Sequence, residues 1–162
     1  MAAVSVFLGF SASAQEQTWQ TIKPVECPFK VEAPALPAVR VDSVRIQGQL
    51  IRTAVYDVQH EWTMFSLSCS DYPFAHELNT REKAIELLKS SAARRVKGEP
   101  TELKEVEVSG YPGIEYVEHL GSAIIYHRAY VAGDKLYQLD VGDLQGTSRE
   151  AAQRFFASFE VE

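Results

Sequence analysis

The sequence predicts an α+β fold, with an antiparallel β-sheet of about six to seven strands and helices packed on it. Three observations support this prediction. Short runs of alternating apolar and polar residues recur along the chain, which is typical of strands with one solvated face. Tight-turn residues separate most of these runs, so we expect antiparallel hairpins. Only two segments show helical spacing of apolar residues, and they lie far apart among the hairpins.

Length and composition indicate one ordinary globular domain. The chain has 162 residues, of which 46% are hydrophobic and 23% are charged, and a domain of this size needs neither a metal nor a disulfide to bury a core. Its 16 basic and 22 acidic residues give a net charge of −6. An acidic chain argues against a nucleic-acid partner.

The N-terminal segment has the pattern of a secretory signal peptide. Met1 to Ala14 contain no charged residue, and Ala2 to Phe10 are apolar, a stretch shorter than the roughly 20 residues that span a bilayer. Ala12-Ser13-Ala14 matches a cleavage site of the A-x-A type. We therefore predict a signal peptide over residues 1–14 and a single domain over residues 15–162, located in the periplasm or outside the cell. The basic residues that open most signals are absent, and a buried N-terminal strand is the alternative.

Four strands are expected in the first half of the chain. Pro34 to Pro37 form a rigid bend after the first of them, Gln47-Gly48 form a turn, and Asp71-Tyr72-Pro73 close the last. In that last strand Phe65, Leu67 and Cys69 form the inward set. The four strands are expected at Phe29–Ala33, around Val39–Ile46, at Leu50–Val58 and at Trp62–Cys69.

The first helix follows this strand region. Asn79 and Thr80 are residues that favour the N-cap, and Glu82 lies three positions after Asn79, as in a capping box. Gly98 and Pro100 are expected to stop the helix. Its apolar face consists of Ala84, Ile85, Leu88, Ala92 and Val96.

The second half predicts a further strand over Leu103–Val108, then a meander, then a helix. Gly110-Tyr111-Pro112-Gly113 is expected to be a turn. Thr147 or Ser148 is expected to cap the second helix, whose apolar face includes Phe155 and Phe156, and Phe159-Glu160-Val161 should be extended. The three meander strands are Ile114–Leu120, Ala123–Val131 and Lys135–Val141, with reversals at Gly121 and at Ala132-Gly133-Asp134.

The two cysteines, Cys27 and Cys69, are a candidate disulfide if the chain is exported, because that compartment is oxidising. The bridge would close a loop of about 40 residues and add roughly 3–4 kcal/mol of stability. The alternative is a pair of buried free thiols that behave as small hydrophobic side chains.

The sequence contains no phosphate-binding loop, no G-x-S-x-G nucleophile motif and no C-x-x-C pair. We therefore predict no catalytic residues, no cofactor and no metal. His119 and His127 flank a predicted hairpin turn and could approach Glu115 or Glu118 as a ligand patch. The alternative is that these residues fill the solvated face of a sheet.

Two further clusters are open to two interpretations. One is acidic and could attract a cation, or could form a solvated face: Glu102, Glu105, Glu107, Glu115 and Glu118. The other is rich in tyrosine and could line an apolar groove, or could pack in the core: Tyr111, Tyr116, Tyr126, Tyr130 and Tyr137.

The order of several short motifs resembles that of small exported bacterial proteins with the PsbP-like (Mog-like) fold. The motifs are Phe29–Pro37 (FKVEAPALP), Asp71-Tyr72-Pro73, Gly110–Glu115 (GYPGIE), Arg128–Tyr137 (RAYVAGDKLY) and Phe155–Phe159 (FFASF). This resemblance implies an α/β/α sandwich without catalysis. Its better-known members perform unrelated binding functions, so no functional residue is transferred to this chain.

The sequence therefore predicts a non-enzymatic exported domain that binds an unknown protein partner or assists an envelope assembly. The alternative is a protein that binds a small molecule, a lipid or a metal ion through the tyrosine-rich sheet or the Glu/His patch. No nucleic-acid partner is expected, nor any transmembrane segment in the mature chain.

Overall fold

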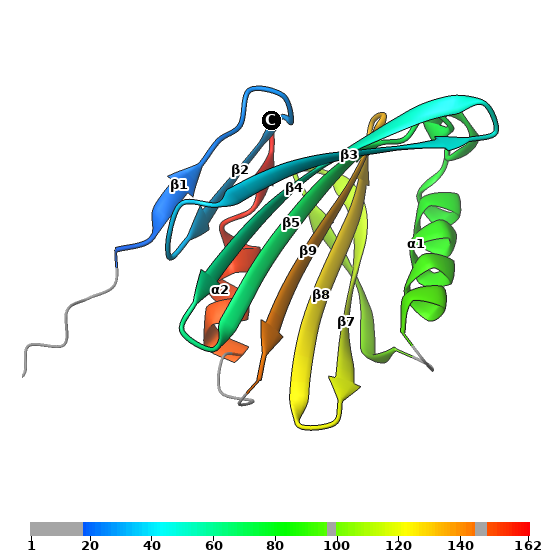
Figure 1. Cartoon of the computed structure of the whole chain (residues 1–162). Helices are drawn as coiled ribbons and strands as arrows, with labels where there is room; N and C mark the ends of the chain where they lie inside the picture. The colour runs from blue at the N-terminus through cyan, green and yellow to red at the C-terminus, as the bar shows by residue number, and fades with distance from the viewer. Residues whose placement is uncertain (1–17, 97–99, 145–148) are drawn as a thin grey trace, which may run out of the picture.

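The computed structural model describes residues 18–96, 100–144 and 149–162. Within them a seven-stranded antiparallel sheet forms the centre of the molecule, in the order β3-β4-β5-β9-β8-β7-β6 (Figure 1). Its strands in chain order are β3 (Ala38–Ile46), β4 (Gln49–His60), β5 (Thr63–Asp71), β6 (Thr101–Val108), β7 (Tyr111–Leu120), β8 (Ala123–Ala132) and β9 (Lys135–Asp143).

A second, smaller sheet has the order β1-β2-β10 and is also antiparallel. It was not predicted, because β1 is too short to show alternation and β10 pairs with a strand from the other end of the chain. Its strands and the helices are β1 (Gln20–Ile22), β2 (Phe29–Ala33), β10 (Glu160–Val161), α1 (Arg81–Arg95), α2 (Arg149–Ala157) and a short 3-10 helix at Ala75–Glu77.

Two-residue turns connect the hairpins of the large sheet, which explains why turn residues predicted the strands well. The turn at Gln47-Gly48 follows the prediction, and both residues have positive φ, of 50° and 81°. The same geometry recurs at Ser109-Gly110, with φ of 49° and 82°. This turn corrects the predicted one at Gly110–Gly113, because Pro112 and Gly113 belong to β7.

The N-terminus of α1 also differs from the expected capping box. Thr80 is the N-cap, and its hydroxyl accepts a hydrogen bond from the backbone N–H of Lys83 at 3.3 Å. The pair of Asn79 and Glu82 therefore does not form the box. The apolar face is as predicted, since Ala84, Ile85, Leu88 and Ala92 are buried. The predicted stop at Gly98, the caps at Thr147 and Ser148, and the signal segment lie outside the described residues.

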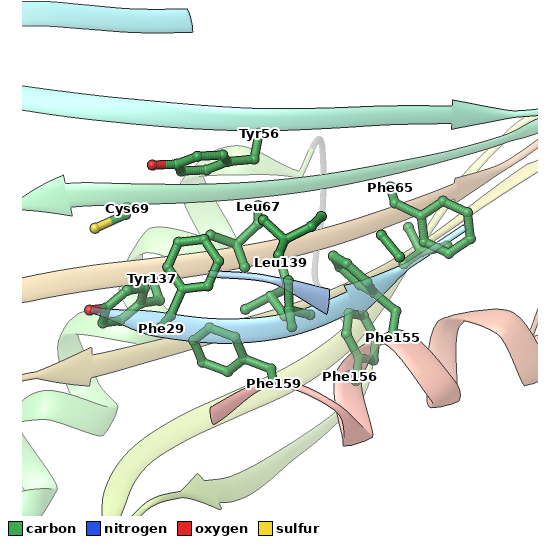
Figure 2. Packing of buried hydrophobic residues seen from close by; sticks show 14 of the residues in the cluster. Phe29, Tyr56, Phe65, Leu67, Cys69, Tyr137, Leu139, Phe155, Phe156 and Phe159 are labelled. Carbon is green, nitrogen blue, oxygen red and sulfur yellow. The ribbon is translucent and has the colours of Figure 1, made fainter. Parts of the chain in front are cut away.

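The large sheet carries a separate core on each face. On one face α1 packs on β7 and β8 through Ile114, Tyr116 and Val131. On the other face lie α2 and the small sheet, which enclose an aromatic core (Figure 2). Phe29 of β2 makes edge contacts with Tyr56 and Tyr137 of the large sheet, with ring centroids 5.3 and 6.2 Å apart. The α+β fold with helices on both faces of an antiparallel sheet is therefore confirmed.

Candidate functional site

The predicted Glu/His patch is divided between the two faces of the large sheet. Neighbouring residues of a strand point to opposite faces, so Glu118 of β7 lies on the α1 side, whereas Glu115 and His119 lie on the α2 side. His127 of β8 pairs with Tyr116 in the register and shares its face. The structure thus brings Glu118 and His127 together, and separates both from Glu115 and from the exposed His119.

His127 is enclosed between two carboxylates. Its Nδ1 lies 2.7 Å from an oxygen of Asp140, and its Nε2 lies 3.4 Å from an oxygen of Glu118. The imidazole stacks on the Tyr116 ring with centroids 4.5 Å apart, and the residue is only 2% exposed. Arg95 at the end of α1 reaches the other Asp140 oxygen at 2.8 Å. Because no substrate can reach a ring covered in this way, the cluster connects α1 to the sheet rather than forming an open site.

Asp140 was missed by the sequence analysis, although a signal for it existed. The hairpin of β8 and β9 turns at Gly133-Asp134, and His127 and Asp140 are equally far from that turn. They must therefore face each other across the two strands. Counting outward from a two-residue turn would have found the contact.

Glu115 is part of a different cluster, which holds α2 against the sheet. It accepts hydrogen bonds from Arg128 and, at 2.6 Å, from Lys104. Burial alone would raise the pKa of Glu115, but these two basic partners outweigh it and hold the pKa below its ordinary value of 4.5. The Arg128 guanidinium lies 4.9 Å from the centre of the Phe156 ring of α2. The role of this cluster is structural.

Four of the five glutamates of the predicted acidic stretch pair with a lysine or arginine, and the fifth, Glu118, lies beside His127. Arg81 and Lys89 of α1 pair with Glu107 and Glu105 of β6, at 2.8 and 2.9 Å. Arg149, at the start of α2, pairs with Glu102 at 3.0 Å. Together with the pairs of Glu115, these contacts neutralise four of the five carboxylates, so the stretch is not an open cation-binding surface. Among the described residues, no group of three or more His, Cys, Asp or Glu side chains is arranged to hold a metal ion.

The tyrosine cluster belongs mainly to the core. Tyr116, Tyr130 and Tyr137 are among the largest fully buried side chains of the described residues, and Tyr126 is also buried. Tyr130 stacks on Phe159 with ring centroids 5.6 Å apart. Tyr111 alone among the five is exposed. Of the two interpretations, core packing therefore describes these tyrosines.

Cys27 and Cys69 come together where the small sheet meets the large one. Cys69 lies near the C-terminal end of β5, and Cys27 lies in the loop between β1 and β2. Both carry free thiols; Cys27 is 5% exposed and Cys69 is 2% exposed, and their side chains are close enough to form a hydrogen bond. They border a cavity of about 200 Å³ whose other lining residues are Glu26, Val41, Arg52, Ala54, Asp71 and Lys135.

The edge strand β3 is the most exposed element of the large sheet. All nine of its residues are exposed, and it pairs only with β4. Its hairpin with β4 extends past the other strands (Figure 1). Large apolar side chains on this hairpin face solvent, namely Val39, Val41, Val44, Ile46 and Leu50.

Comparison with known proteins identifies the fold but not a family. No protein-family model matches the chain, and no curated protein matches it. Among solved structures, the chain is similar to the solution structure of cyanobacterial PsbP (CyanoP) from Synechocystis sp. PCC 6803. The TM-score is 0.53 and the identity 15%, over 96% of this chain and 99% of that one.

This likeness confirms that the fold is PsbP-like, as the motif order predicted. At 15% identity it carries no information about activity or partners, because one fold supports many functions. Membership of a group of small exported proteins stays a prediction. In the described part of the chain, every helix is too short or too polar to cross a lipid bilayer.

Proposed function

We propose that this chain is a non-catalytic accessory domain that binds a partner protein along the free edge of β3. The observation that carries the proposal is the exposed, apolar character of that edge. An edge strand offers unpaired backbone N–H and C=O groups, and proteins normally protect such edges with charge, proline or a covering element. β3 contains no proline and only three charged residues, Arg40, Asp42 and Arg45.

The opposite edge of the same sheet supports this interpretation by contrast. β6 carries Lys104 and three glutamates, Glu102, Glu105 and Glu107, and all three glutamates pair with residues of α1 or α2. The β6 edge is thus protected by charged side chains and by contacts with the helices, whereas the β3 edge exposes valine and isoleucine. The occupant that fits β3 is an extended segment of a partner with apolar residues on both of its faces. Such a segment adds a strand, and it would cover Val39 and Val41 on one face of the edge and Val44 and Ile46 on the other.

Site-specific crosslinking tests this proposal. A photoreactive residue at Val41 is expected to capture a defined protein in the cells of origin, whereas the same residue at Lys104 on the β6 edge should not. The captured protein should then bind in purified form. The double variant Val41→Lys with Val44→Lys should weaken that binding at least tenfold, and Leu103→Lys on β6 should leave it unchanged.

Other outcomes would contradict the proposal. If sedimentation shows that the protein pairs with itself through β3, the edge serves dimer formation instead of a partner. If the photoreactive residue captures the partner equally well at Val41 and at Lys104, the β3 edge is not the binding surface. The same follows if the Val41→Lys, Val44→Lys variant binds the purified partner as tightly as the wild-type protein does.

The proposal includes export, which is supported by the chargeless segment and the Ala12-Ser13-Ala14 pattern. Mass spectrometry of the protein isolated from its own cells should find a chain that begins at Gln15. Recovery of the protein with residues 1–14 still attached would contradict export by cleavage. The partner-binding part of the proposal would stand, because the crosslinking experiment measures it separately.

A further inference from the structure

The cavity at Cys27 and Cys69 suggests a second property, which does not require partner binding at the β3 edge, although Val41 of β3 lines part of the cavity. We propose that this cavity is a thiol–disulfide exchange site, where a small disulfide oxidises the two cysteines to an intramolecular disulfide. Both cysteines are buried members of the aromatic core, and both also line this cavity, which is the side from which a small molecule would reach them.

Aromatic residues fix the position of the Cys27 loop relative to β5. Tyr137 is the cross-strand neighbour of Cys69, and its hydroxyl donates a hydrogen bond to the carbonyl of Pro28 at 3.3 Å. Phe29, two residues after Cys27, packs between Tyr56 and Tyr137. Figure 2 shows Cys69 with the hydroxyl groups of both tyrosines on the same side of the core. The two thiols are therefore held together by the packing of the two sheets.

The surroundings make the two sulfur atoms chemically unequal. The hydrogen bond from the Cys69 thiol, with smaller contributions from the Tyr56 hydroxyl and the Lys135 charge, lowers the pKa of Cys27 to about 7 against the opposing effects of burial and of Asp71. The same hydrogen bond, together with burial, raises the pKa of Cys69. The lowered pKa favours the thiolate form of Cys27 over that of Cys69, and thiolates are the attacking species in exchange. Because its pKa is raised, Cys69 stays protonated while Cys27 attacks.

The charged lining suits a small zwitterionic disulfide. Lys135 pairs with Asp71, and Arg52 pairs with Glu26 at 3.6 Å, so two cations and two anions surround the cavity. Disulfides built from amino acids, such as oxidised glutathione, carry ammonium and carboxylate groups that can pair with both signs of charge. A volume of about 200 Å³ accommodates one end of such a molecule.

The exchange has two steps. The Cys27 thiolate attacks one sulfur of the small disulfide; its S–S bond breaks, and the departing thiolate takes up a proton. Cys69 then gives up its proton to solvent and attacks the sulfur of Cys27, which forms the Cys27–Cys69 bond and breaks the mixed disulfide; the second small molecule leaves as a thiolate and takes up a proton from solvent. Two protein thiols are oxidised by two electrons, and one disulfide is reduced to two thiols.

Oxidised glutathione is the probe for the first test. At pH 7.5 the wild-type protein should lose both alkylatable thiols and two hydrogen atoms in mass, and dithiothreitol should restore them. The oxidised protein should melt about 10 °C higher, because the bond restricts the unfolded chain. Two thiols that stay free at every ratio of oxidised to reduced glutathione would overturn the proposal. So would disulfides that form only between molecules.

Two serine variants test the assigned order of attack. Cys69→Ser should accumulate a mixed disulfide of glutathione with Cys27. In Cys27→Ser, Cys69 should react at least ten times more slowly, and an equal rate would overturn the assignment. Circular dichroism must show that both variants are folded. If either is not, brief alkylation of the wild-type protein with peptide mapping gives the same answer, since Cys27 should be labelled first.

Lys135→Met provides a control for the local charge. It should slow alkylation of Cys27 at pH 7, where the lysine stabilises the thiolate. Lys30→Met removes a lysine whose ion pair with Glu160 is at the small sheet, outside the cavity lining, and should not change the rate. The groups that face the two thiols and must be considered in any pH profile are Tyr56, Tyr137, Arg52, Glu26, Asp71 and Lys135.

Discussion

Gly113 of β7 is a residue at which the sheet has no room for a side chain. A Cβ atom there would lie 2.2 Å from a carbon of the Tyr130 ring and 2.6 Å from the carbonyl oxygen of Ala129. The motif that the sequence analysis interpreted as a turn is therefore a strand in which an aromatic ring covers a glycine. Its glycine is required by packing, since its backbone has ordinary strand geometry.

The first prediction follows from this close approach. Gly113→Ala should lower the free energy of unfolding by about 2–3 kcal/mol, because the backbone or Tyr130 must shift. Gly142→Ala in β9 is the matched control, since a Cβ there meets nothing within 4 Å, and it should change stability by less than about 0.5 kcal/mol. Urea unfolding of both variants measures the difference. Equal effects would show that the Tyr130 contact is not the cause.

Glu115 yields the second prediction, which concerns pH. The folded state holds its pKa below 4.5, so the stabilisation it provides is complete above the pKa of the unfolded chain and is lost as pH falls through the folded value. Glu115→Gln should cost about 1–3 kcal/mol at pH 7, because it leaves Arg128 without its half-buried partner.

Below pH 5 the free energy of unfolding of Glu115→Gln should fall less steeply with pH than that of the wild-type protein. Unfolding curves measured between pH 3 and pH 7 would detect this difference. Glu105→Gln is the control, since its ion pair with Lys89 is exposed and such pairs contribute little. An unchanged acid profile in Glu115→Gln would contradict the assigned role.

At the scale of elements, strand boundaries were predicted better than the contacts between strands. Alternation and turn residues located β2 to β9, because these are local properties of the chain. The face on which Glu115 and Glu118 lie was also available locally, since residues three apart on a strand point to opposite faces. The predicted patch overlooked this rule. The pairing of β2 with β10 was not available, because it joins Lys30 to Glu160 and leaves no local pattern.

The helix α1 provides the third prediction. Thr80→Ala removes the side chain that accepts the Lys83 N–H at the N-cap and should cost about 1 kcal/mol. Asn79→Ala should cost less than about 0.5 kcal/mol, because Asn79 accepts only from the exposed side chain of Lys83. Thermal unfolding of both variants distinguishes the N-cap from its neighbour. The opposite ranking would show that Asn79 caps the helix.

At the scale of the whole molecule, the two faces of the large sheet are held with different strength. The α2 face joins residues of eight elements, β1, β2, β4, β5, β7, β8, β9 and α2, around aromatic rings such as Phe29 and Phe159. On the other face α1 presents only small or aliphatic residues, two of them alanines, to β7 and β8. Its remaining links include the ion pairs from Arg81, Lys89 and Arg95. Exposed ion pairs add little, so α1 should separate from the sheet before the aromatic core unfolds.

Native-state hydrogen exchange with two core variants tests this fourth prediction. Leu67 lies in the aromatic core and Leu88 on the buried face of α1, and replacing either by alanine should cost about 2–4 kcal/mol. If α1 opens alone, the contacts of Leu67 persist in the open state. Leu67→Ala should then lower the opening free energy of amides in β5 and β9 but leave that of the α1 amides unchanged.

Leu88→Ala should instead lower the opening free energy of the α1 amides and of the β5 and β9 amides. Its contacts are lost both when α1 separates from the sheet and when the whole molecule unfolds. The α1 amides should also show a weaker dependence on denaturant than those of β5, since their opening exposes less surface. If Leu67→Ala lowers the opening free energy of α1 and β5 by the same amount, α1 opens only when the whole molecule unfolds. In that case the ion pairs from α1 to β6 and β9 contribute far more than exposed pairs usually do, and the two faces form one cooperative unit.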